Sequence, residues 1–182
     1  YAHRDLSSGL PAFVAMTSQQ QRELPKAHRH LWGSGFLPRR HQAVKFVGGT
    51  EPLFFLNNPA GITPRIRKQM IDAVNSLANA AEDHGPLTRA MLDNYQTAID
   101  LQKHLPEVAR IEDEPQYILD MYGPEVTQPS SYAYNCLIAR RLIERGVTAV
   151  QLIHRGWDHH EYLNERLRTQ TRIVDQPSAA LI

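Results

Sequence analysis

The most regular pattern of apolar and polar positions in the chain runs from residue 133 to residue 153. Apolar side chains recur at helical spacing over Ala133–Arg145, with Cys136, Ala139, Leu142 and Ile143 on one side. The opposite side is mostly charged: Arg140, Arg141, Glu144 and Arg145. Gly146 can adopt the left-handed conformation that closes a helix. The run Val147–Ile153 is too apolar for a strand with one wet face, so we predict a central strand covered on both faces, parallel to a neighbour.

Shorter apolar runs nearer the N-terminus predict additional strands. Leu10–Met16 is one candidate, and the polar segment Thr17–His30 after it is typical of a loop. Ala43–Val47 and Leu53–Leu56 are two further candidates, joined through Gly48-Gly49. Because a glycine pair suits a tight turn, these two runs are expected to form a hairpin.

Residues 63–105 have the pattern of an inserted helical hairpin. Thr63 is placed to cap a helix whose first position is Pro64. A second helix is expected over Leu87–His104. The apolar rows of the two helices would pack on each other, and Met70 would then be a core residue.

The segment between this hairpin and the helix of residues 133–145 is expected to be largely irregular. Pro106–Pro115 is acidic and offers no clear period, Tyr117–Tyr122 could form one or two helical turns, and the stretch to Ser131 is expected to be a linker.

Both ends of the sequence suggest a fragment. The chain starts at Tyr1, and Pro177–Ile182 resembles the first turn of a helix capped by Asp175 or Ser178 that does not continue. We therefore expect residues 1–182 to be an internal fragment of one α/β domain, truncated at both ends.

Composition excludes several classes of protein. The 20 Lys and Arg residues nearly balance 19 Asp and Glu, a formal net charge of +1. That balance disfavours a nucleic-acid partner and an electrostatic membrane anchor. No apolar run approaches the roughly 20 residues that span a bilayer. The single cysteine, Cys136, excludes an internal disulfide, and its place on the apolar helix face predicts a core residue, not a nucleophile.

A cluster of possible metal ligands follows the strand predicted over residues 147–153. Asp158 and His160 are two positions apart, so in an extended or loop backbone their side chains point to the same side and could share one cation. A carboxylate with an imidazole suits zinc, manganese or iron better than calcium or magnesium. Gly156 would allow a sharp turn below the ion, and His159 would point away. The same residues could instead form a histidine-rich surface loop, and spacing does not decide between the two.

The chain also carries a family resemblance. The segments concerned are LPAFVAM, LWGSGFLP, HQAVKF, LFFLNNPAG, ARRLIERGV and GWDHH. Together they resemble a large bacterial family known as domain of unknown function 1501, described as sulfatase-like and placed in the alkaline-phosphatase superfamily. That family usually shows G-W-D-x-H, which Gly156, Trp157, Asp158 and His160 match, with His159 in the variable place.

The resemblance implies an α/β fold of the alkaline-phosphatase and sulfatase type, in which a mixed sheet is flanked by helices and a metal centre lies at the strand ends. Residues 132–182 would supply a helix, a strand and a metal-binding loop of that fold. It further implies hydrolysis of sulfate or phosphate esters of small molecules or glycans, and export to the periplasm. Asp158 and His160 are the ligands it carries over, whereas the family's nucleophile and its other ligand segments do not occur in this sequence. His154 and Arg155 would lie at the rim, where Arg155 could hold an anionic ester group or be a plain surface residue.

Two functions of different class remain open at this point. One is a metal-dependent ester hydrolase. The other is a relative of the same fold that binds a metal or a glycan and has lost catalysis. A Ser, Thr or Cys beside an upstream metal-binding Asp would favour the enzyme.

Overall fold

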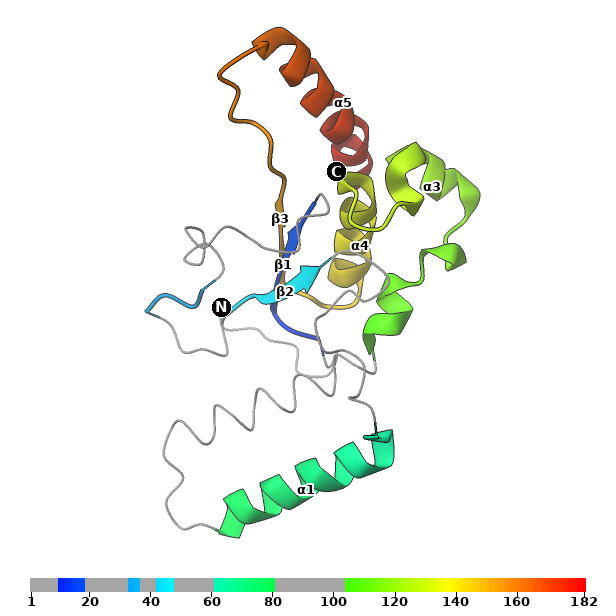
Figure 1. Cartoon of the computed structure of the whole chain (residues 1–182). Coiled ribbons are helices and arrows are strands. Elements are labelled where there is room, and N and C mark those ends of the chain that lie inside the picture. The colour runs from blue at the N-terminus through cyan, green and yellow to red at the C-terminus, as the bar shows by residue number, and fades with distance from the viewer. Residues whose placement is uncertain (1–9, 19–32, 37–41, 48–60, 81–103) are drawn as a thin grey trace.

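The computed structural model describes residues 10–18, 33–36, 42–47, 61–80 and 104–182 (Figure 1). The elements in chain order are β1 (Phe13–Thr17), β2 (Val44–Val47), α1 (Pro64–Ala80), the 3-10 helix η4 (Ile111–Asp113), α3 (Gln116–Tyr122), the 3-10 helix η5 (Pro124–Thr127), α4 (Tyr132–Glu144), β3 (Ala149–Ile153) and α5 (Leu163–Leu181). None of the helices among these described residues is long and apolar enough to cross a membrane.

The strands form a small parallel sheet in the order β2-β1-β3. Val14 of β1 is in register with Val44 of β2 on one side and with Val150 of β3 on the other. The expected parallel pairing of β3 is confirmed. Its expected central position is wrong among the described strands, because β1 occupies the centre.

The burial of the strands agrees with this order. Val14, Ala15 and Met16 of β1 are buried, whereas β3 begins at the exposed Ala149 and its other residues are only half-buried. The apolar run that predicted a strand covered on both faces therefore belongs to an outer strand of the described sheet. The expected hairpin partner, Leu53–Leu56, lies outside the described residues.

Helix α4 is delimited by side-chain and backbone caps at its two ends. At the start, Ser131 Oγ accepts a hydrogen bond from the backbone N–H of Tyr134 at 2.9 Å. At the end, Gly146 has a φ of 94°, and its N–H donates to the Ile143 carbonyl at 3.0 Å. The Val147 N–H donates to the Leu142 carbonyl at 3.1 Å. These two bonds form a Schellman motif, so the closing role predicted for Gly146 is confirmed.

The core lies where α4 packs beside the sheet. The strands with their flanks contribute Leu10, Val14, Met16 and Phe46, and α4 with its flanks contributes Tyr134, Cys136, Leu137, Ile138, Leu142 and Val147. Figure 1 shows α4 running alongside β3. Asn135 ties the two layers by donating through Nδ2 to the Thr17 carbonyl at 3.0 Å. The apolar face predicted for this helix is thus the face that contacts the sheet, although Ile143 is 48% exposed.

Glu114 joins the segment before α3 to α4. Its Oε2 lies 2.6 Å from Arg140 Nη2, and its Oε1 lies 2.5 Å from Arg141 Nη1. Arg141 also donates to the Glu107 carbonyl at 2.8 Å, and its side chain is buried. Residues 104–109 are helical and η4 follows, so the irregular structure expected over Pro106–Pro115 is largely absent. Residues 104–114 therefore lie against the charged side of α4, and the Glu114 carboxylate forms ion pairs with the two arginines there.

The last helix differs most from expectation. Pro177–Ile182 is the end of α5, not the first turn of a new helix, and neither Asp175 nor Ser178 is its cap. Pro177 lies inside the helix, where a proline lacks the N–H that would bond the carbonyl four residues earlier. Pro177 is buried, and α5 packs against α4 and α3. The stabilisation from this packing offsets the free-energy cost of an interior proline, which would otherwise end the helix.

Helix α1 begins as predicted, since Thr63 Oγ1 accepts from the Ile66 N–H at 3.2 Å. Its apolar row is not buried: Met70 is 56% and Val74 44% exposed. Met70 is therefore not the core residue that we expected, and the second helix of the expected hairpin lies outside the described residues.

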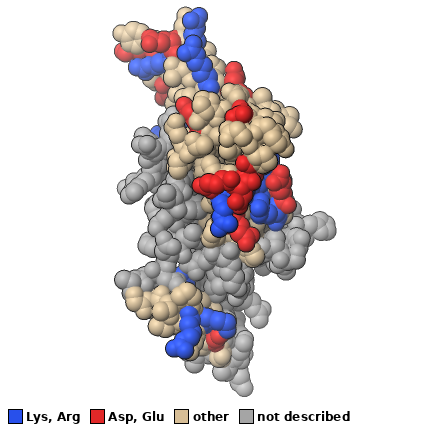
Figure 2. Space-filling model, turned by 90° about the vertical axis from the view of Figure 1, so that its right-hand side faces the viewer, with Lys and Arg blue, Asp and Glu red and all other residues tan. Residues whose placement is uncertain are grey.

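On the face shown in Figure 2, acidic and basic side chains lie intermixed, in keeping with the balanced charge.

Candidate metal site and adjoining pocket

The candidate site lies in the loop of residues 154–162, between β3 and α5. In a parallel sheet the carboxyl ends of the strands meet at one edge, and this loop starts there beside the end of β1. Gly156 turns the chain with a φ of 97°, and a Cβ at that position would come within 2.5 Å of Gln170 Nε2. The sharp turn predicted for Gly156 is confirmed, and the close approach of α5 is a second reason for a glycine.

Asp158 and His160 come together at the outer side of this loop. The distance from Asp158 Oδ1 to His160 Nε2 is 3.0 Å, and the two side chains are 89% and 84% exposed. Two donors that each lie about 2.0–2.1 Å from one ion are about 2.9–3.4 Å apart. The separation of 3.0 Å is that of a direct ion pair or hydrogen bond between the two side chains, and it also matches the spacing of neighbouring ligands. The described residues contain no group of three or more His, Cys, Asp or Glu arranged to hold an ion.

His159 occupies a different environment from its two neighbours. Its side chain is half-buried, and its Nε2 is inaccessible to solvent and has no hydrogen-bond partner among the described residues. Exposed and covered side chains thus alternate along Asp158, His159 and His160, as the sequence spacing predicts for an extended loop.

His154 anchors the start of the loop. Its Nδ1 lies 2.5 Å from Ser18 Oγ, just past β1, and its Nε2 lies 2.8 Å from Gln170 Oε1 on α5. The rings of Tyr132 and Trp157 meet the imidazole edge-on, with centroids 5.1 Å and 6.1 Å away. His154 therefore joins β1, α4 and α5 below the loop. Its role follows from these contacts to strand and helix, which spacing along the chain does not reveal.

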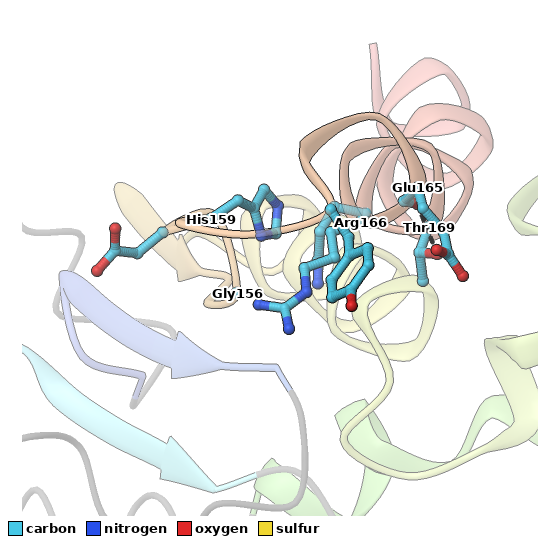
Figure 3. A pocket seen from close by; sticks show the side chains of 8 residues that line it. Gly156, His159, Glu165, Arg166 and Thr169 are labelled. Atoms are coloured by element: carbon cyan, nitrogen blue, oxygen red, sulfur yellow. Dashed lines mark hydrogen bonds between the residues drawn. The ribbon is translucent and has the colours of Figure 1, made fainter.

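A pocket of about 560 Å³ adjoins the loop on the side of α5. It is lined by Gly156, Asp158, His159, Tyr162, Glu165, Arg166, Thr169 and Gln170. Figure 3 shows Arg166 extending toward the turn at Gly156, whereas Glu165 and Thr169 lie at the other side of the view. Arg155, the arginine that we had considered for binding an anion, is exposed and outside this lining.

Sequence reasoning missed Arg166 because it treated the end of the chain as a truncated stub. The available signal was the helical spacing of Tyr162, Arg166 and Gln170, which places these side chains on one face of a helix. A helix that starts directly after a ligand-bearing loop brings such a face to the loop.

Cys136 is not part of this site. Its side chain is fully buried, and burial raises the pKa of its thiol to about 11. A thiol with so high a pKa carries little thiolate at neutral pH, so the prediction of an inert core cysteine is confirmed.

Neither the curated proteins nor the solved structures contain a significant match to the chain. A family model described as "Protein of unknown function (DUF1501)" matches residues 1–182. The chain therefore belongs to the DUF1501 family.

Proposed function

We propose that the full-length protein is a metal-dependent hydrolase of sulfate or phosphate esters, with a fold of the alkaline-phosphatase and sulfatase type. Asp158 and His160 would each supply one ligand to a divalent transition ion such as zinc or manganese. The observation that carries the proposal is the 3.0 Å approach of these two side chains in a loop at the carboxyl edge of a parallel sheet. The resemblance of Gly156, Trp157, Asp158 and His160 to the G-W-D-x-H pattern adds support.

The bound ion would polarise the ester and lower the pKa of the attacking group. Asp158 contributes a negative charge that offsets the charge of the cation, and His160 contributes a neutral nitrogen donor. Both side chains are exposed, so they can bind an ion without first losing a buried partner. His154 holds the loop to Ser18 and Gln170, which restricts the positions that the two ligands can occupy.

Two protein ligands are fewer than a tightly held transition ion requires, since such sites use three or four. The remaining ligands and the nucleophile are expected in parts of the full-length protein that supply the family's other motifs. The proposal therefore concerns the full-length gene product.

The function can be tested with nitrophenyl sulfate and nitrophenyl phosphate. We expect the purified full-length protein to hydrolyse at least one of these esters, to lose at least about 100-fold in kcat/KM on chelation, and to recover when zinc or manganese is returned. Asp158→Ala and His160→Ala should each show the loss without chelator. A protein that retains a stoichiometric metal and hydrolyses neither ester would instead support a non-catalytic metal-binding or glycan-binding relative.

A further inference from the structure

We propose that the pocket between the 154–162 loop and α5 binds an oxyanion, with Arg166 as its main ligand and His159 as a second donor. The ligand class is a tetrahedral sulfate or phosphate group. The inference rests on the proposed function in one respect, since the group would then be the ester group or the product anion of the hydrolase. The pocket borders Asp158, so an anion held there would lie beside the candidate metal pair.

Arg166 is the cation of the pocket lining. Among the described residues it makes no ion pair within 4 Å, and its guanidinium carbon lies over the Tyr162 ring, 6.0 Å from the ring centroid. The ring limits the positions of the arginine without neutralising it. A guanidinium presents a planar fork of donors that matches two oxygens of one anion, so Arg166 is available for bidentate binding.

His159 supplies a second polar group that needs a partner. Its Nε2 is shielded from solvent and accepts or donates no hydrogen bond among the described residues. Leaving such a nitrogen without a partner is unfavourable. Since His159 lines the same pocket as Arg166, an anion oxygen bound there could accept a hydrogen bond from an Nε2–H.

The start of α5 favours the same ligand. Its N-cap residue, Tyr162, has a left-handed backbone with a φ of 52° and makes no side-chain cap hydrogen bond. The Glu165 N–H already donates to the Tyr162 carbonyl at 3.1 Å, but no N-cap side chain accepts from the first turn, and the positive end of the helix dipole lies at the loop. This feature adds to the two side chains and does not define the pocket by itself.

Two carboxylates in the lining set a condition on binding. Asp158 and Glu165 would repel an anion, although Glu165 lies on the other side of Arg166 in Figure 3. A cation on Asp158 and His160 would cancel the charge of Asp158. Metal and anion should therefore bind with positive linkage, each increasing the affinity of the other by the same factor.

The test is titration of the full-length gene product with inorganic phosphate and, separately, inorganic sulfate, by calorimetry, first as purified and then in the presence of chelator. We expect saturable binding of at least one anion, weakened at least tenfold in Arg166→Gln. Arg168→Gln is the matched control, because Arg168 lies on the same exposed helix outside the pocket lining, and it should bind as the native protein does. Arg166→Lys keeps the charge and loses the fork, so it should fall between the two.

A second pair of variants separates the two donors from the metal ligands. His159→Phe should weaken anion binding about threefold to tenfold, the equivalent of one neutral hydrogen bond, whereas His160→Ala should leave chelator-state binding unchanged. Absence of saturable binding, or equal loss in Arg166→Gln and Arg168→Gln, would overturn the inference. Binding that depends on Arg166 in a protein without esterase activity would uphold it and refute the proposed function alone.

Discussion

Neighbouring side chains of one type have different roles in this chain because the backbone turns them to different surroundings. His154 is bound on both ring nitrogens, by Ser18 and Gln170, and cannot also hold an ion without breaking one of these bonds. His159 is half-buried beside a pocket, and His160 is exposed beside Asp158. The assignment of His160 as the candidate ligand therefore rests on what the other two histidines contact.

The thiol of Cys136 gives a prediction at the residue scale. At pH 8 in native conditions, we expect its reaction with a disulfide reagent to be at least about 100-fold slower than in denaturant. The reason is that burial raises the pKa from its ordinary value of 9.0 to about 11 and also blocks access. Cys136→Ala serves as the blank. Equal rates in the folded and unfolded protein would show that the packing of α4 against the sheet does not bury this residue.

At the scale of elements, the sequence predicts best where local signals and tertiary packing agree. Helix α4 combines an apolar face, the Ser131 cap and the Gly146 Schellman motif, and its predicted bounds differ from the observed ones by one residue at each end. For α5 the two levels disagree. Pro177 is a strong local stop signal, but the helix continues through it because its buried face packs on α4 and α3.

The position of β3 shows a second kind of limit. An apolar run predicts a strand, and the parallel pairing follows from the helix before it. The order of strands depends instead on contacts between segments more than 100 residues apart, such as that of Phe13 with Ala149. Neither periodicity nor composition contains that information. For the same reason, the approach of Arg166 and Gln170 to the loop was not predicted.

At the scale of the whole molecule, Glu114 connects the segment of residues 104–114 to α4. Burial raises the pKa of its carboxyl, but hydrogen bonds from Arg140 and Arg141 and their charges outweigh that effect, so the net pKa is lowered. A carboxyl with a lowered folded pKa stabilises the protein above the unfolded pKa of about 4.3. That stability is lost as the pH falls through the folded value.

Glu114→Gln should lower the free energy of unfolding at pH 7 by about 3 kcal/mol, because it leaves Arg141 buried without its counter-charge. The difference between variant and native protein should shrink as the pH falls below about 4. Asp113→Asn is the control: its carboxylate is exposed and 3.9 Å from Arg110, so the change should stay within about 0.5 kcal/mol. Urea unfolding across pH would measure both, and a pH-independent difference would contradict the charge interpretation.

The central claim is that Asp158 and His160 hold a metal ion, and metal content measures it most directly. Full-length protein and the variants Asp158→Ala, His160→Ala and His159→Ala would be purified alike and analysed by elemental mass spectrometry. We predict a divalent transition ion in the native protein and in His159→Ala, and loss of most of it in the other two. Retention of metal in His160→Ala with loss in His159→Ala would show that the wrong histidine was assigned. Unchanged metal content in all three variants would mean that the loop is a polar surface segment and would contradict the account.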